Sequence, residues 1–88
     1  MTATFRASCL RDVQKIRDPI LLARIRAAIK TVEAADDLRN VSDLKKLSGS
    51  SGFYRVRVGD YRIGVAIEDE TVEFVRVLHR SDIYRAFP

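Results

Sequence analysis

Hydrophobic and polar residues alternate along the stretch 53–65, which reads Phe-Tyr-Arg-Val-Arg-Val-Gly-Asp-Tyr-Arg-Ile-Gly-Val. Because successive side chains of a strand point to opposite faces of a sheet, this alternation predicts two strands with one apolar face. Gly59-Asp60, between the two strands, is suited to a two-residue hairpin turn. The expected cross-strand pairs are Val58 with Tyr61, Arg57 with Arg62, and Arg55 with Gly64.

A second hairpin is expected to follow, with Asp69-Glu70 as its turn and a strand over residues 71–78. Its expected pairs are Ile67 with Val72 and Val65 with Phe74. Strict alternation would also place Arg76 in the core, where an unpaired charge is costly. We therefore infer either a bulge near residues 75–77 or a strand that is buried on both faces.

The first part of the chain has a period of three to four residues, which predicts two helices after a short strand at residues 2–6. The first helix is expected at residues 8–17. The second begins at Asp18-Pro19, an N-cap residue followed by proline, and runs to about Ala35. The apolar stripe of the first helix comprises Leu10, Val13 and Ile16. The buried face of the second comprises Leu22, Ile25, Ala28, Ile29 and Val32. The cations beside that face, Arg24, Arg26 and Lys30, are interpreted as solvated.

Residues 36–52 follow neither the two-residue period of a strand nor the three- to four-residue period of a helix, and they are expected to form a loop. Within it, one short helical turn or docked segment is indicated by Val41, Leu44 and Leu47. The run Ser-Gly-Ser-Ser-Gly at 48–52 is expected to have no secondary structure and to be mobile. Residues 81–88 form a tail in which Ile83 and Phe87 would anchor at helical spacing.

The expected order is therefore strand, helix, helix and three strands, an α+β fold with a mostly antiparallel sheet packed on two helices. The length of 88 residues corresponds to a single domain spanning the whole chain. No apolar run approaches the roughly 20 residues that cross a bilayer, and the first residues do not resemble a signal peptide. We expect a cytoplasmic protein that does not bind membranes.

The few residues with metal or redox chemistry point to a protein without a cofactor. Cys9 is the only cysteine, so an intrachain disulfide cannot form. His79 is the only histidine, and one histidine with one distant cysteine cannot form a zinc site of the usual kind. We therefore expect no metal and no cofactor.

The predicted hairpin sets Arg55, Arg57 and Arg62 on one face, opposite the apolar core. Like charges that face each other destabilise a sheet, so their retention indicates that they bind an anion. The net charge of +4 fits a nucleic-acid partner but is weak evidence alone. Lys45 and Lys46, in the loop before the hairpin, are candidates for contacts with a phosphate backbone, although a plain connecting loop is the alternative.

The chain contains the segments Tyr-Arg-Val-Arg-Val-Gly-Asp-Tyr-Arg at 54–62 and His-Arg-Ser-Asp-Ile-Tyr-Arg at 79–85. Together these segments resemble the RelE/ParE superfamily of bacterial type II toxins, and the RelE branch in particular. The resemblance implies an endoribonuclease that cuts mRNA in the ribosomal A site. In such enzymes the 2′-hydroxyl attacks the adjacent phosphate without a metal. It also implies a cognate antitoxin that silences the toxin in a hetero-oligomer.

The resemblance assigns site roles to five positions, which are Arg55, Arg57, Arg62, Arg80 and Tyr84. The first two are lysines in the best-known RelE pattern, and arginine keeps its proton at any ordinary pH, which makes Arg57 a poor general base. Tyr84 is therefore one candidate base, since nearby guanidinium groups would lower its pKa. His79 is the other, because its unperturbed pKa lies near neutrality.

Two other functions are compatible with the sequence. A ParE-like toxin would inhibit DNA gyrase by binding it and would need no face that cleaves phosphate bonds. A plain RNA-binding module would keep the basic face but lack the reaction.

Overall fold

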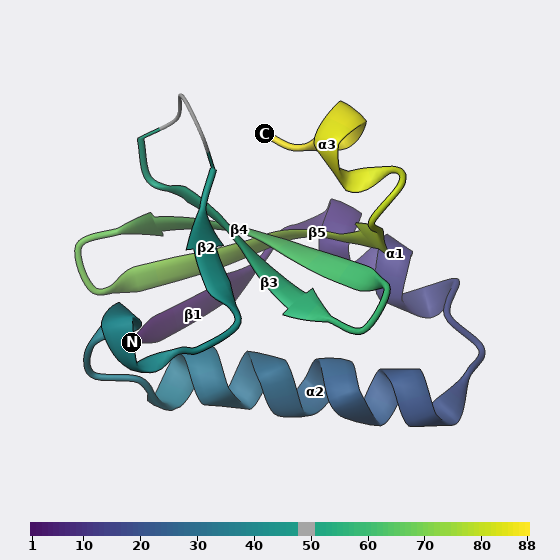
Figure 1. Ribbon diagram of the computed structural model, residues 1–88, viewed down its shortest axis with the longest axis horizontal. Helices are drawn as coiled ribbons and strands as arrows, with labels where there is room; N and C mark the ends of the chain where they lie inside the picture. Colours follow the sequence, from purple (N-terminus) through teal and green to yellow (C-terminus); the bar gives the residue numbers. More distant parts are fainter. Residues whose placement is uncertain (48–50) are drawn as a thin grey trace.

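The computed structural model describes residues 1–47 and 51–88, whose strands form one mixed sheet of five (Figure 1). The order across the sheet is β1-β5-β4-β3-β2. Strand β1 pairs with β5 in parallel, and the other neighbouring pairs are antiparallel. The strands are β1 Thr2–Phe5, β2 Leu44–Lys46, β3 Phe53–Val58, β4 Tyr61–Glu68 and β5 Thr71–His79. The expected α+β class is confirmed.

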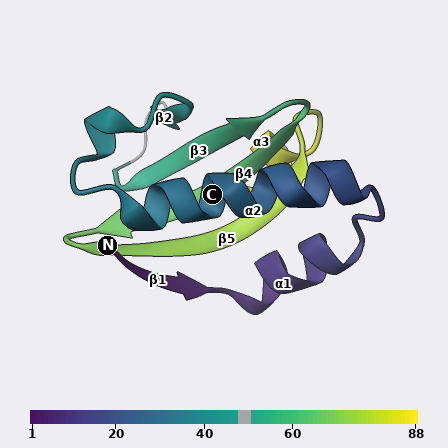
Figure 2. The ribbon, with the colours of Figure 1, turned by 90° about the horizontal axis from the view of Figure 1, so that it is seen from below.

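Helices cover both faces of this sheet unequally (Figures 1 and 2). The long helix α2, Pro19–Ala34, crosses one face, whereas the short α3, Ile83–Ala86, lies over the other. Helix α1, Ala7–Gln14, packs against β5. The side chain of Asp18 accepts hydrogen bonds from the first free backbone N–H groups of α2, which is the N-cap that the sequence predicts.

The main core lies between α2 and the sheet. Ile25 and Val32 of α2 are buried there against apolar residues that β3, β4 and β5 turn toward the helix. The strand residues of this core are Val56, Val58, Ile63, Val65, Val72, Phe74 and Val77. Burying each such side chain contributes about 1.5–3 kcal/mol, so this layer is the principal stabilising element.

Both hairpins have the register expected from the sequence. Val58 pairs with Tyr61 and Arg57 with Arg62, while the second hairpin pairs Ile67 with Val72. The first turn needs glycine because Gly59 has a φ of +59°, a conformation that side chains disfavour.

Strand β5 contains a bulge at Val75. Gly64 pairs with Arg76 but the next residue, Val65, pairs with Phe74, so Val75 is the extra residue. The Val75 side chain packs on the sheet face that α3 covers, called the α3 face below, whereas Phe74 lies in the main core on the opposite face. The sequence left a bulge and two-sided burial as alternatives, and both occur, because the bulge is what turns apolar side chains to the two faces.

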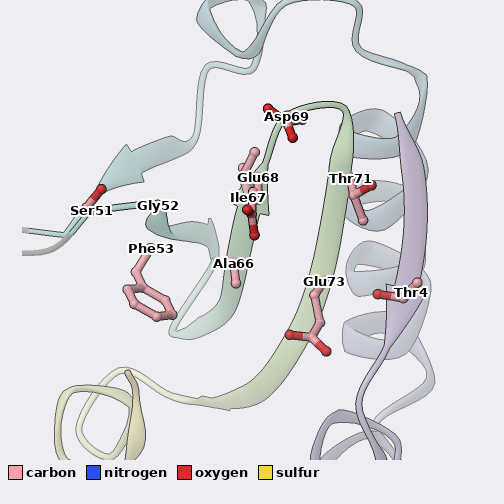
Figure 3. A pocket seen from close by; sticks show the side chains of 10 residues that line it. All are labelled: Thr4, Ser51, Gly52, Phe53, Ala66, Ile67, Glu68, Asp69, Thr71 and Glu73. Carbon is pink, nitrogen blue, oxygen red and sulfur yellow. The ribbon is translucent and has the colours of Figure 1, made fainter.

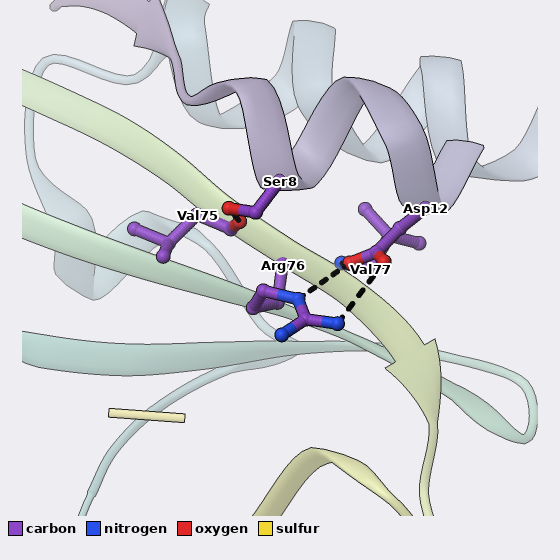
Figure 4. A network of polar contacts seen from close by, with 5 residues as sticks. All are labelled: Ser8, Asp12, Val75, Arg76 and Val77. Atoms are coloured by element: carbon purple, nitrogen blue, oxygen red, sulfur yellow. Dashed lines mark hydrogen bonds and ion pairs between the residues drawn. The ribbon is translucent and has the colours of Figure 1, made fainter. Parts of the chain in front are cut away.

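The bulge brings Arg76 to a carboxylate of α1 (Figure 4). The Asp12 side chain, which is 4% exposed, accepts hydrogen bonds from Nε and Nη2 of Arg76 at 2.8 and 3.2 Å. It also accepts one from the backbone N–H of Val77 at 2.9 Å. The hydrogen bonds to Asp12 raise the pKa of the Arg76 guanidinium. Strict alternation would place the Arg76 charge in the core, but in the structure Arg76 lies beside the core and is paired with Asp12.

The C-terminal tail, which includes α3, packs on this α3 face of the sheet through Ile83 and Phe87. Both residues are buried, as the sequence predicts. The Phe87 ring lies so close to Gly64 that a Cβ there would be 2.7 Å from two ring carbons. Phe53 contacts the same ring edge to face, with centroids 5.6 Å apart. Gly64 therefore provides the space that the tail occupies.

The expected first helix is partly confirmed. Val13 and Ile16 pack on the main core as the stripe predicts, but Leu10 is 52% exposed, and helix α1 ends at Gln14 rather than residue 17. The buried residues of α1 are Cys9 and Asp12, which lie three positions apart and therefore on one face of the helix. The polar Asp12 is buried because it contacts Arg76.

Strand β2 was not predicted from the sequence. Residues 38–40 form a single 3-10 turn, and β2 pairs antiparallel with β3, with Leu44 opposite Val56. Leu44 docks on the core as expected, but as part of a strand that covers the edge of β3. Residues 48–50 of the Ser-Gly run lie outside the described residues.

Replacing Asp12 by alanine leaves Arg76 and the Val77 N–H without their acceptor. We expect the free energy of unfolding to fall by about 3 kcal/mol, measured by urea denaturation. The control is Glu73→Ala, which removes the partner of Arg6 in an exposed ion pair of 2.7 Å and should cost less than about 1 kcal/mol. Equal losses in the two variants would contradict a structural role for the Asp12 ion pair.

Burial raises the pKa of the Cys9 thiol from its ordinary 9.0 to about 11, and the negative charge of Asp12 adds to the effect. The folded state therefore holds this proton more tightly than the unfolded state. The resulting stabilisation is complete below pH 9.0 and is lost as the pH rises to about 11. We expect the urea midpoint of the wild type to fall across this range more than that of Cys9→Ala. If the urea midpoints of the two proteins fell in parallel with pH, this contribution of Cys9 to stability would be refuted.

Candidate functional site

A hollow of about 450 Å³ lies at the β3–β4 turn and gathers guanidinium groups from four segments. Its lining residues are Arg24, Asp43, Arg57, Gly59, Asp60, Arg62 and Arg80. Three of these arginines, Arg57, Arg62 and Arg80, are candidates named from the sequence, and the structure brings them together. Four arginines against two aspartates leave the hollow positively charged, as an anion site requires.

Arg62 is held against its own turn. Its Nη1 donates to the carbonyl oxygens of Gly59 at 2.8 Å and Tyr61 at 2.9 Å. Its Nε is buried and has no hydrogen-bond partner within the described residues. An unpaired buried donor costs about 1–3 kcal/mol. The guanidinium is thus fixed in place without being neutralised by a carboxylate.

Arg57 and Arg80 each lie near one carboxylate, and both ion pairs are exposed. Arg57 Nη2 is 3.5 Å from Asp43, and Arg80 Nε is 3.9 Å from Asp60. Both arginine side chains are at least 60% exposed. Solvated ion pairs of this length are worth at most about 1 kcal/mol, so an incoming anion can displace the carboxylates.

Arg24 reaches the hollow from α2 and was not identified by the sequence analysis, which placed it on a solvated helix face. Its Nη1 lies 3.1 Å from the position that a Cβ on Gly59 would take. The contact joins residues far apart in the sequence, and helical periodicity carries no signal for it. Arg24 is the residue that sequence reasoning missed.

The remaining basic candidates lie away from the hollow. Lys45 pairs with Arg55 in the sheet, so these two side chains share the face of Arg57 but do not line the hollow. Lys46 pairs with Tyr54, whose side chain packs on the main core. Lys46 therefore belongs to the α2 face of the sheet, opposite the other cations.

His79 also lies on the α2 face. It pairs with Tyr61, which packs on the main core, and the two rings meet edge to face at 5.7 Å. The backbone N–H of Ser81 donates to His79 Nδ1 at 3.1 Å, which assigns the proton of the neutral ring to Nε2. His79 does not line the hollow, and neighbouring Arg80 does.

Tyr84 lies on α3 with 58% of its surface exposed and does not line the hollow either. In α3 it stands between the buried anchors Ile83 and Phe87. The exposed side chain of Tyr84 is thus carried by a short helix whose anchors, Ile83 and Phe87, are buried.

A second hollow, of about 480 Å³, lies beside the β4–β5 turn and has the opposite charge (Figure 3). Glu68, Asp69 and Glu73 line it together with Phe53 and neutral residues. Three carboxylates would repel a phosphate, so the arginine-lined hollow is the candidate anion site although it is slightly smaller.

Within residues 1–47 and 51–88, no group of three or more histidine, cysteine, aspartate or glutamate side chains could hold a metal ion. No helix of this described part is both long and apolar enough to cross a membrane.

Comparison with known proteins gives consistent matches over nearly the whole chain. A family model described as the ParE toxin of the type II toxin–antitoxin system parDE matches residues 4–84. Toxin RelE3 of Methanocaldococcus jannaschii is 36% identical over 89 residues, covering 100% of both chains. Toxin RelG of Mycobacterium tuberculosis is 35% identical over 86 residues, covering 96% of this chain and 95% of its own.

Among solved structures, the RelB–RelE antitoxin–toxin complex from Methanococcus jannaschii is similar, with a TM-score of 0.79 and 34% identity. The match covers 97% of this chain and 99% of that chain. The similarity therefore extends to the arrangement of the elements around the hollow.

Replacing Asp43 by asparagine removes the carboxylate beside Arg57 and should strengthen anion binding. We expect the affinity for a short single-stranded oligonucleotide to rise about two- to fivefold at low salt, measured by fluorescence anisotropy. Asp36→Asn, which neutralises an exposed carboxylate after α2, is the control and should change the affinity less. If both variants gain equally, net charge alone explains the effect and the hollow is not the binding site.

Proposed function

The chain belongs to the RelE/ParE superfamily of type II toxin–antitoxin toxins, and we propose that it is a ribosome-dependent endoribonuclease of the RelE type. The observation that carries this proposal is the hollow at the β3–β4 turn, where Arg57 of β3, Arg62 of β4 and Arg80 of the turn after β5 converge. Its proposed occupant is the ribose-phosphate chain of mRNA in the ribosomal A site, and its proposed location is the cytoplasm.

The proposed reaction is attack of a ribose 2′-hydroxyl on the adjacent phosphate. The 2′-oxygen forms a bond to phosphorus while the bond to the leaving 5′-oxygen breaks, which yields a cyclic phosphate and a 5′-hydroxyl. A base takes the 2′-hydroxyl proton, an acid protonates the leaving oxygen, and cations stabilise the charge on the phosphate.

The arginines suit the electrostatic part of this reaction. A guanidinium binds two phosphate oxygens through parallel N–H bonds, so Arg57 and Arg62, paired across β3 and β4, can hold the scissile phosphate. Arg80, whose carboxylate partner is 3.9 Å away, is proposed to stabilise the transition-state charge and the leaving oxygen. Arg55 and Lys45 lie farther along the same face and are proposed to hold flanking phosphates, whereas Lys46 lies on the opposite face and is left out of the proposed contacts.

The general base stays a prediction shared by Tyr84 and His79. Tyr84 is exposed on the short helix α3, four residues after Arg80 of the hollow. Because Nε2 of the neutral His79 ring carries the proton, His79 could accept a proton only on Nδ1, and the hydrogen bond from the Ser81 N–H to that atom would first have to break. Arg57 remains protonated and cannot serve as the base.

A cognate antitoxin is the proposed protein partner. The similar structure from Methanococcus jannaschii is a RelB–RelE antitoxin–toxin complex. By analogy we propose that this chain forms a toxin–antitoxin hetero-oligomer and is inactive within it. The ribosome and mRNA are the proposed partners of the free toxin.

A second candidate function is inhibition of DNA gyrase, favoured by one observation. The family model that matches residues 4–84 is described as a ParE toxin. Under this candidate the arginines would contact a protein, and mRNA would stay intact when the toxin is expressed.

Arg62→Ala tests the nuclease proposal in a translating extract, with mRNA 3′ ends mapped after addition of purified protein. Since Arg62 would neutralise the transition-state phosphate, we expect cleavage to slow by about 100-fold or more. Arg11→Ala, an exposed arginine on α1, is the control and should cleave like the wild type. Uncut mRNA with the wild type, together with inhibited DNA supercoiling by gyrase, would replace the proposal by the second candidate.

A further inference from the structure

We propose that Arg24 binds a second phosphate of the substrate, so that single-stranded RNA crosses the β3–β4 turn toward α2. This inference rests on the proposed function and extends it, because it adds a residue outside the sheet and gives the RNA a direction. It assigns Arg24 the phosphate next to the one that is cut.

Arg24 stands between two hollows. One is the arginine-lined hollow, and the other, of about 250 Å³, is lined by Asp18, Ile20, Leu21, Arg24, Gly59, Asp60 and Tyr61. The two hollows share Arg24, Gly59 and Asp60. An RNA strand that leaves the first hollow over Gly59 therefore enters the second hollow beside the Arg24 guanidinium.

The second hollow suits a nucleotide rather than a lone ion. Arg24 is the one cation among its lining residues, beside two carboxylates: Asp18, which accepts hydrogen bonds from the first N–H groups of α2, and Asp60, which lies near Arg80. The exposed Ile20 and half-buried Tyr61 supply apolar and aromatic surface. Bases and sugars of single-stranded RNA pack on such surfaces while a basic group holds the phosphate.

Arg24 is also the arginine of the hollow whose donors are least engaged. Arg57 and Arg80 lie near carboxylates, and Arg62 bonds to carbonyl oxygens. Within the described residues, Arg24 takes part in no hydrogen bond or ion pair, although its Nη1 lies close against Gly59. Its full set of guanidinium donors is available to a phosphate.

Arg26 provides a matched comparison on the same helix. It carries the same charge and is exposed. Because an α-helix rotates by more than half a turn over two residues, Arg26 points away from the β3–β4 hairpin, and it lines neither hollow. A difference between Arg24 and Arg26 therefore reports position and not net charge.

The test measures binding of a short single-stranded oligoribonucleotide whose 2′-hydroxyls are methylated, so that it cannot be cleaved. Fluorescence anisotropy over a series of salt concentrations gives both the affinity and the salt dependence. Each phosphate contact with single-stranded nucleic acid contributes about 0.7 to the slope of log affinity against log salt. We expect Arg24→Ala to lower the slope by about this amount and the affinity about tenfold.

Arg26→Ala should keep the wild-type slope, and Arg24→Lys should keep the slope but lose part of the affinity, since it retains charge without the planar fork. Unchanged urea midpoints establish that the variants fold. If Arg24→Ala matches Arg26→Ala while Arg62→Ala weakens binding, Arg24 is a solvated cation and this inference fails alone. If Arg62→Ala also binds normally, or the wild type does not bind at low salt, the phosphate site itself is wrong.

Discussion

The ion pair between Asp12 and Arg76 is the interaction that fixes α1 to β5 and the position of the strand after its bulge. The bulge at Val75 lets β5 bury side chains on both faces, but it leaves a guanidinium beside the core. Asp12 neutralises that charge and also accepts the Val77 N–H, which fixes α1 to β5 directly after the bulge. The strand then resumes its register and delivers Arg80 to the end of the sheet where the hollow lies.

Ion pairs in this protein fall into two physical kinds. The Asp12 carboxylate is almost fully buried and makes short bonds to two nitrogens of one guanidinium, so breaking it leaves a stranded charge. The pairs of Arg57 with Asp43 and of Arg80 with Asp60 are longer and solvated, so water or a phosphate can replace either carboxylate at little cost. The first kind holds the fold together, and the second lets several arginines stand close together without blocking them.

The features that follow from local chemistry could be predicted from the sequence. Alternation and the Gly59-Asp60 turn determine the hairpin register, and the awkward position of Arg76 signals the bulge. Features that depend on distant contacts could not. Strand β2 has three residues, too few for a period, and it forms because the edge of β3 accepts it. Arg24 joins the candidate site only through the crossing of α2 over the hairpin turn, and no pattern within α2 encodes that crossing.

The acidic β4–β5 turn and the arginines at the other end of β4 have a consequence for how the molecule approaches a partner. Carboxylates at one tip and guanidiniums at the other give the protein an electric dipole along its strands. Close to a polyanionic surface, such a dipole experiences a torque that turns the arginine end forward before any contact forms. If the partner is a polyanion, as proposed above, productive collisions would be more frequent than a random tumbling search would allow, and added salt would remove the advantage.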